Sequence, residues 1–305
     1  MPRIVAVCPK EFPGVSAAFK NGHALGLWEF MPFGERIPLD ATVLIVGTWW
    51  DIYMQFLINP AVTVVPFFTS TFGQMGFSRN RVEFVQVGIV KKLMESNKIK
   101  YVLAGWEELI KYAFMKYEKE DRAFWCPYPL SIQANKVSIA WLDKIENSIG
   151  LFTPNAERKN LDNQILAAFN SGELHTNVPV VLSGERVKIY DWLPSDSYRK
   201  VISRLKITLH CGFTESFCYA AAESIAAGTI PIVSLQIARN LGIPECLPIV
   251  VHQLDSVSEI KEKISLTLSW KEEEYSERLA FLSSKLAEKA EWNRTVIKII
   301  LDKLL

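Results

Sequence analysis

Long hydrophobic runs, paired cysteines and an excess of one charge are all missing from this sequence of 305 residues. No apolar stretch approaches the roughly 18 residues of a membrane-spanning helix, and the N-terminus has no signal-peptide core. The 34 Lys and Arg nearly balance the 33 Asp and Glu, so we expect no nucleic-acid partner. The five cysteines are odd in number and scattered, which favours reduced thiols and a cytoplasmic location.

Motifs for metal ions and dinucleotides are missing as well. The sequence has no Asp-x-Asp of the kind that holds a diphosphate through a divalent ion, and no cluster of His and Cys at metal-ligand spacing. It also has no Gly-x-Gly-x-x-Gly after its first predicted strand, which argues against a dinucleotide oxidoreductase. We therefore expect no metal and no resident cofactor.

Predicted strands and helices alternate along nearly the whole chain, the pattern of parallel α/β sheets. The length exceeds what one hydrophobic core usually supports, so two domains are expected. We place the first at residues 1–130, a connector at 131–148 and the second at 149–290. The terminal helix, 291–305, is expected to pack back on the first domain.

One segment, residues 214–233, is the most informative. It predicts a loop that carries Glu215, an alanine-rich helix that carries Glu223, a Gly-Thr turn and a buried strand. The helix would begin near Ser216 and Phe217, where unpaired N–H groups and the positive end of the helix dipole suit a phosphate. Glu223 would lie on an apolar helix, where a carboxylate needs a partner such as a ligand hydroxyl. Phosphate and hydroxyls together indicate a nucleotide-sugar.

This segment resembles the C-terminal signature of the retaining GT-B glycosyltransferases (glycosyl transferases group 1), which include sucrose synthase and many bacterial mannosyl- and glucosyltransferases. Their hallmark is two Glu separated by seven residues, usually Glu-Gly-Phe-Gly, an alanine-rich helix with Glu, and Ala-x-Gly-x-Pro-Val-Val. The family has glycine where this chain has Ser216 and Cys218. The resemblance implies a GT-B fold, in which two Rossmann-like parallel-sheet domains face each other across a cleft. It also implies that Glu215 contacts the transferred sugar and Glu223 the ribose.

Two adjacent cations, Arg158 and Lys159, follow the strand that opens the second half. The family has an Arg and a Lys near this loop, and its Lys precedes Gly or Asn, as Lys159 precedes Asn160. The resemblance implies that both neutralise the donor diphosphate, whose charge grows as it departs. A solvated charged turn is the alternative interpretation.

Two further residues, Leu193 and Gly14, are predicted on the donor side. Leu193 lies between a strand and a helix where the family contacts the nucleobase, and Gly14 follows the first strand where the family has a glycine-rich loop. We expect Ser195 or Asp196 to cap the helix after Leu193. His210, at a strand end, could face the cleft and titrate, but a packed histidine is the favoured interpretation.

Candidates for binding the acceptor lie in the first half. Trp49, Trp50 and Asp51 follow a predicted strand, where an indole ring could stack on a sugar, and Arg79 lies in a loop with two glycines. Packing in the core is the alternative for each of them. A second alternative for the aromatic cluster is contact with a lipid-linked acceptor at a membrane surface.

The sequence therefore predicts a metal-independent, retaining glycosyltransferase. Its donor is expected to be a nucleotide-sugar, with UDP or GDP as the nucleotide, and its acceptor a glycan, a lipid-linked molecule or a small molecule. Two other classes stay open: a nucleotide-sugar epimerase of GT-B fold, and a protein that binds a nucleotide or glycan without catalysis.

Overall fold

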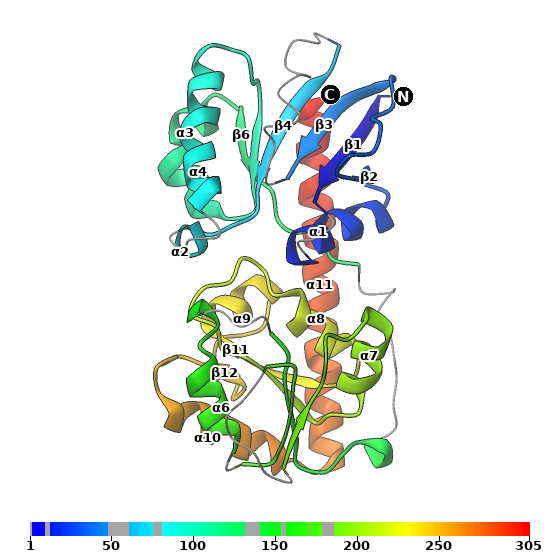
Figure 1. The fold of residues 1–305 in the computed structure, drawn as a ribbon, viewed down its shortest axis with the longest axis vertical. Coiled ribbons are helices and arrows are strands. Elements are labelled where there is room, and N and C mark those ends of the chain that lie inside the picture. The colour runs from blue at the N-terminus through cyan, green and yellow to red at the C-terminus, as the bar shows by residue number, and fades with distance from the viewer. Residues whose placement is uncertain are drawn as a thin grey trace. The chain divides into compact units, whose positions relative to one another are not determined.

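The computed structural model of the chain describes residues 2–9, 13–47, 61–75, 81–131, 141–153, 157–169, 171–178 and 186–305. The chain divides into two compact units. Unit 1 comprises residues 1–131 together with 290–305, and unit 2 comprises residues 132–289. Within these described residues, each unit contains a six-stranded parallel sheet with helices between its strands (Figure 1).

In unit 1 the strands follow the order β2-β1-β3-β4-β5-β6. Near-continuous apolar runs such as Ala41–Val46 form them, because both faces of a parallel sheet are covered. The strands are β1 (Arg3–Cys8), β2 (Glu29–Pro32), β3 (Ala41–Val46), β4 (Thr63–Phe68), β5 (Val102–Ala104) and β6 (Ala123–Trp125). The helices are α1 (Pro13–Ala24), α2 (Phe72–Met75), α3 (Arg81–Glu95), α4 (Glu107–Ala113) and α5 (Met115–Lys119).

In unit 2 the strand order is β12-β11-β10-β7-β8-β9. The strands are β7 (Ser148–Leu151), β8 (Glu173–Thr176), β9 (Val187–Ile189), β10 (Ile207–His210), β11 (Ile230–Ser234) and β12 (Val250–Val251). The helices are η3 (Trp141–Asp143), η4 (Glu157–Lys159), α6 (Leu161–Phe169), α7 (Ser195–Ser203), α8 (Tyr219–Ala226), α9 (Leu235–Leu241) and α10 (Val257–Leu268); η3 and η4 are 3-10 helices. The central strands β10 and β11 are buried along their whole length.

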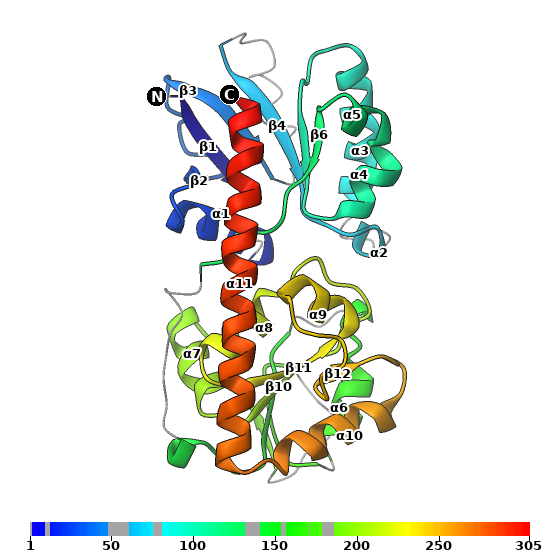
Figure 2. The same cartoon turned by 180° about the vertical axis from the view of Figure 1, so that it is seen from behind.

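The last helix, α11 (Glu272–Leu304), contributes to both units (Figure 2). Its residues up to Lys289 belong to unit 2 and those from Ala290 onward to unit 1. In unit 1, Asn293 Nδ2 donates to the carbonyl of Tyr128 at 2.8 Å, and the ring of Trp292 lies 5.4 Å from that of Trp125.

Several elements differ from the expectations drawn from the sequence. The sequence pattern predicts one helix over residues 106–117, but the structure interrupts it at Phe114, which separates α4 from α5. The sequence does not predict strands β2 and β8, because both are short and partly polar. It does not predict helix α9 either, because α9 continues the apolar run of the strand before it. The pattern also predicts a helix at 49–58 and a strand at 178–183. The first lies outside the described residues, as does most of the second, and Val178 itself is not in a strand.

Tyr275 anchors the start of α11 in the core of unit 2. Its hydroxyl donates to the carbonyl of Lys206 at 2.6 Å and accepts from the N–H of Ile230 at 3.2 Å, so it contacts the N-terminal ends of both β10 and β11. The side chain is 2 % exposed, and burial raises the pKa of its hydroxyl well above the usual value.

We predict that Tyr275→Phe lowers the free energy of unfolding by about 1–2 kcal/mol, because buried backbone groups lose a partner. Chemical denaturation measures the change. Tyr112→Phe is the matched control, since Tyr112 is 77 % exposed and its hydroxyl should contribute almost nothing. Equal effects of the two substitutions would contradict the anchoring role.

Candidate active site

The order of the strands in unit 2 reverses between β7 and β10. From β7 the chain proceeds to β8 and β9 on one side, and the later strands β10, β11 and β12 lie on the other. Because ligands of parallel sheets bind at the carboxyl ends of the strands where the order reverses, the loops after β7 and β10 are the expected site.

Two amide side chains fasten the loop after β7 to the end of β10. Asn160 has a left-handed backbone, φ 54°, and its Nδ2 donates to the carbonyls of Cys211 at 3.0 Å and Leu254 at 2.6 Å. Gln164 donates from Nε2 to the carbonyl of Lys159 at 2.7 Å and accepts the N–H of Cys211 at 2.9 Å. The backbone that carries Lys159 is therefore fixed relative to β10.

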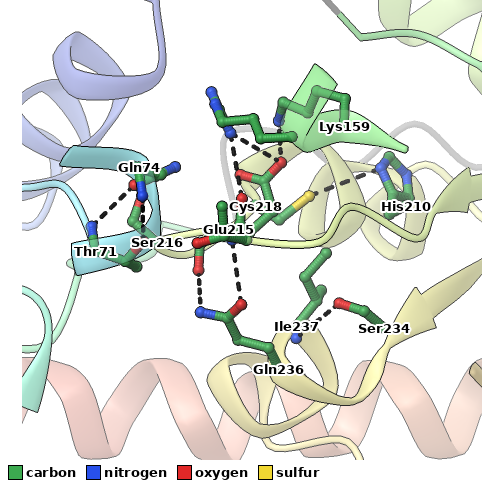
Figure 3. Close-up of polar contacts among 12 residues, drawn as sticks. Thr71, Gln74, Lys159, His210, Glu215, Ser216, Cys218, Ser234, Gln236 and Ile237 are labelled. Carbon is green, nitrogen blue, oxygen red and sulfur yellow. Dashed lines mark hydrogen bonds and ion pairs between the residues drawn. The ribbon is translucent and has the colours of Figure 1, made fainter. Parts of the chain in front are cut away.

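The two loops meet in a cluster of three charged side chains (Figure 3). Lys159 Nζ forms an ion pair with Glu215 Oε1, and Arg158 Nη1 lies 3.6 Å from the same oxygen. Arg158 Nη1 also donates to the carbonyl of Thr214 at 3.3 Å. The side chain of Glu215 is 8 % exposed, that of Lys159 14 % and that of Arg158 21 %. Two cations thus share one carboxylate in a shielded position, which favours binding of an anion.

Helix α9 holds the loop that carries Glu215. Gln236 donates from Nε2 to the carbonyl of Glu215 at 2.6 Å and accepts the N–H of Glu215 at 3.2 Å (Figure 3). One turn later, Asn240 Nδ2 donates to the carbonyl of Ser216 at 2.9 Å. Neither residue was predicted, because α9 was not recognised. The only signal for them in the sequence is the spacing of two amide side chains, Gln236 and Asn240, four residues apart just after a buried strand.

Helix α8 begins two residues later than the sequence analysis expected. Its first residue is Tyr219 and Cys218 occupies the N-cap position, so Ser216 and Phe217 lie in the preceding turn. Cys218 has φ 69° and ψ 68°, the left-handed region that glycine occupies without a steric penalty. The glycine of the resembled family at this position is the signal that could have predicted this conformation.

Behind Cys218, a chain of hydrogen bonds runs through His210. Ser224 donates to the carbonyl of Ala220 at 2.8 Å, and Thr208 donates to Ser224 at 2.8 Å. Because both hydroxyl protons are used, His210 Nε2 must be the protonated nitrogen that donates to Thr208 at 3.1 Å. His210 Nδ1 is then free to accept the thiol of Cys218 at 3.7 Å (Figure 3).

Burial keeps His210 and Cys218 neutral. It lowers the pKa of His210 to about 3, with a further contribution from the charge of Lys159, and it raises the pKa of Cys218 to about 12. His210 is therefore packed, as expected, and is unsuited to general acid or base work at neutral pH.

The second carboxylate, Glu223, lies on α8 and is half-buried. Burial raises its pKa above the usual value, and the charge of Arg199 on α7 partly opposes this shift. Among the described residues its carboxylate has no hydrogen-bond or ion-pair partner. The two carboxylates thus have different surroundings. Glu215 contacts two cations, whereas Glu223 has no polar partner among the described residues.

The remaining predicted residues are dispersed or fall outside the description. Leu193 is half-buried in the segment between β9 and α7, and Gly14 lies in the first turn of α1. Trp49, Trp50, Asp51 and Arg79 lie outside the described residues. The expectation that Ser195 or Asp196 caps α7 is wrong: the helix begins at Ser195, and its N-cap, Pro194, provides no side-chain bond.

The described residues contain no group of three or more His, Cys, Asp or Glu placed to hold a metal ion. Within the same residues, every helix is too short or too polar to cross a bilayer.

Comparison with known proteins gives matches in structure only. No family model matches the sequence, and no curated protein of similar sequence was found. Anabaena HepE in complex with UDP and glucose matches with a TM-score of 0.68 and 11 % identity, over 100 % of this chain and 99 % of that one. A trehalose-6-phosphate synthase matches with a TM-score of 0.66 and 10 % identity, over 98 % and 99 %. TarM of S. aureus, in complex with fondaparinux, alpha-GlcNAc-glycerol and UDP, matches with 0.64 and 11 % identity, over 86 % and 55 %.

The chain has the GT-B fold. Its structural neighbours are GT-B glycosyltransferases, and both parallel sheets of this chain agree with the α/β architecture predicted from the sequence. At 10–11 % identity, the structural similarity establishes the fold only. The activity has to be inferred from the residues of the site.

The left-handed backbone of Cys218 yields a prediction about stability. Cys218→Gly and Cys218→Ala both remove the thiol, but only glycine adopts this conformation without strain. We expect the free energy of unfolding of Cys218→Gly to exceed that of Cys218→Ala by about 1 kcal/mol.

The same pair of substitutions at Cys246 is the control. Cys246 is exposed and has no left-handed backbone, so there the alanine variant should be the more stable. Denaturation of the four variants measures both differences. The same order at both positions would contradict strain at Cys218.

Proposed function

We propose that this GT-B protein is a retaining glycosyltransferase that uses a UDP-sugar as donor and needs no metal ion. The observation that carries the proposal is the cluster of Lys159, Arg158 and Glu215 at the reversal of the sheet order. The proteins of similar fold that were determined with UDP support uracil as the base.

The cluster suits a diphosphate because its cations outnumber its carboxylate. A bound diphosphate would compete with Glu215 for Lys159 and Arg158, and it would replace one buried ion pair by another. Fixed cations then stabilise the charge that grows on the leaving diphosphate, which is the work that a divalent ion performs in metal-dependent transferases. Metal independence follows from this assignment.

The same exchange gives Glu215 its role. Once Lys159 binds phosphate, the carboxylate is free to accept hydrogen bonds from hydroxyls of the transferred sugar. Gln236 and Asn240 hold the backbone of this loop, so the carboxylate is pre-organised. Glu223, which has no partner among the described residues, would accept the ribose hydroxyls.

The proposed chemistry is attack from the face of the leaving group. The acceptor oxygen forms a bond to the anomeric carbon as the bond from that carbon to the phosphate oxygen breaks. The acceptor proton moves to the departing phosphate, and the configuration is retained. The protein contributes position and charge, and its acceptor is a glycan, a lipid-linked molecule or a small molecule.

The assignment predicts different effects for the two carboxylates. Glu215→Gln should leave the affinity for free UDP unchanged or higher, because Lys159 no longer has to leave a carboxylate, while sugar transfer falls. Glu223→Gln should weaken UDP and the intact UDP-sugar alike, by about 1.5–3 kcal/mol for charge-assisted bonds to the ribose.

Titration calorimetry with EDTA present, on both variants and the wild type, measures these affinities. Equal losses for both ligands in both variants would overturn the assigned roles. If wild-type protein binds UDP only when a divalent ion is supplied, metal independence is wrong.

A further inference from the structure

Unit 2 has a hollow of about 510 Å³ at the end of its sheet opposite the candidate active site. The lining residues are Leu142, Asp143, Lys144, Ile145 and Arg204. Ile145 lies three residues before β7 and Arg204 three residues before β10, and the N–H of Ile145 donates to the carbonyl of Arg204 at 2.7 Å. The candidate active site lies at the carboxyl ends of the same two strands. The hollow is therefore a separate place, with the volume of a small-molecule pocket.

Lys144 is fixed in the wall of this hollow. Its Nζ donates to the carbonyls of Ser203 at 2.9 Å and Leu205 at 2.8 Å, and it lies 3.4 Å from the hydroxyl of Thr229. Because all three acceptors are uncharged, these bonds hold the ammonium group without neutralising it. Burial, together with the charge of Lys206, lowers the pKa of Lys144 to about 8, so most of its positive charge is kept at pH 7.

Two further cations adjoin the hollow, and neither is neutralised. Lys206 Nζ lies 4.5 Å from the ring centroid of Trp141, directly before the lining residues in the sequence. Arg204 is exposed. Among the described residues no carboxylate pairs with Lys144, Arg204 or Lys206, and the guanidinium of Arg204 has no hydrogen-bond partner. Asp143, which is exposed, is the one acidic residue of the lining.

This combination of charge and lining matches an anion that has an apolar part. Cations without a counter-charge repel one another, and an anion between them relieves that repulsion. The guanidinium of Arg204 offers a planar fork of N–H donors, which suits the oxygens of a phosphate. Three cations against one carboxylate favour a group with two negative charges over a single carboxylate. Leu142 and Ile145 provide apolar surface beside the charges.

We propose that the hollow binds a phosphorylated small molecule, with its phosphate at Arg204 and its apolar part against Leu142 and Ile145. Lys144 and Lys206 act on the ligand through their charge, since Lys144 Nζ already donates to the backbone. The site does not depend on the proposed function, because it shares no residue with the cluster of Lys159, Arg158 and Glu215.

Calorimetric titration with phenyl phosphate at low ionic strength tests the proposal. This probe carries a dianionic phosphate and an apolar ring, and it has no hydroxyl to act as a sugar acceptor. The titrations use Lys159→Gln as the background, because this substitution removes the cation proposed to bind the donor phosphate. The background protein should bind phenyl phosphate, and the further substitution Arg204→Gln should weaken binding at least about fivefold. Benzoate, with one negative charge, should bind the background protein several-fold more weakly than phenyl phosphate.

Arg36→Gln in the same background is the matched control. Arg36 is also exposed and has no ion pair among the described residues, but it belongs to unit 1. Arg36→Gln should leave the affinity for phenyl phosphate unchanged, and neither arginine substitution should lower the melting temperature. Equal weakening by both substitutions would indicate a general loss of positive charge and overturn the site. So would no binding to the background protein, or benzoate bound as tightly as phenyl phosphate. These results would leave the proposed function standing, since that is tested with UDP.

Discussion

The arrangement of unit 2 depends on the ion pair between Lys159 and Glu215. It joins the loops after β7 and β10, the two neighbouring strands between which the sheet order reverses. Charges this shielded are costly to bury unless each is paired and further bonded. Arg158 provides the additional contact to the carboxylate, so the cluster keeps one cation in excess. That excess is what makes the site attractive to an anion and ties the fold to its proposed function.

The loops are held in place by amides and by unusual backbone conformations. Asn160 and Cys218 both have positive φ, and each stands next to a residue or helix that would contact the donor. Asparagine tolerates the left-handed backbone region, whereas cysteine does not. Cys218 is held in this conformation by the hydrogen-bond chain through His210. Strain at such a position is typical of functional sites, where the surrounding structure over-determines the backbone.

The sequence predicted the parallel α/β sheets and the loops that carry Lys159 and Glu215, because buried apolar runs and the residues after them are visible in the chain. It did not predict the clamp by Gln236, since α9 continues the apolar run of β11 and cannot be separated from it by periodicity. The start of α8 was placed two residues early, because capping at Cys218 uses backbone conformation and no side-chain bond. The hydrogen-bond chain of His210 was hidden for another reason: its members come from β10 and α8 and meet only in the fold.

We propose that Lys159 binds the diphosphate of the donor and that its role goes beyond the ion pair with Glu215. Calorimetric titration of UDP into wild type, Lys159→Gln and Lys188→Gln tests it most directly. Lys188, on β9, forms an ion pair with Glu173 and has a side chain that is 53 % exposed, so its variant controls for a general loss of positive charge. The account predicts that UDP binds Lys159→Gln at least tenfold more weakly, about 1.4 kcal/mol, and Lys188→Gln as tightly as wild type. Unchanged affinity of Lys159→Gln for UDP would contradict it.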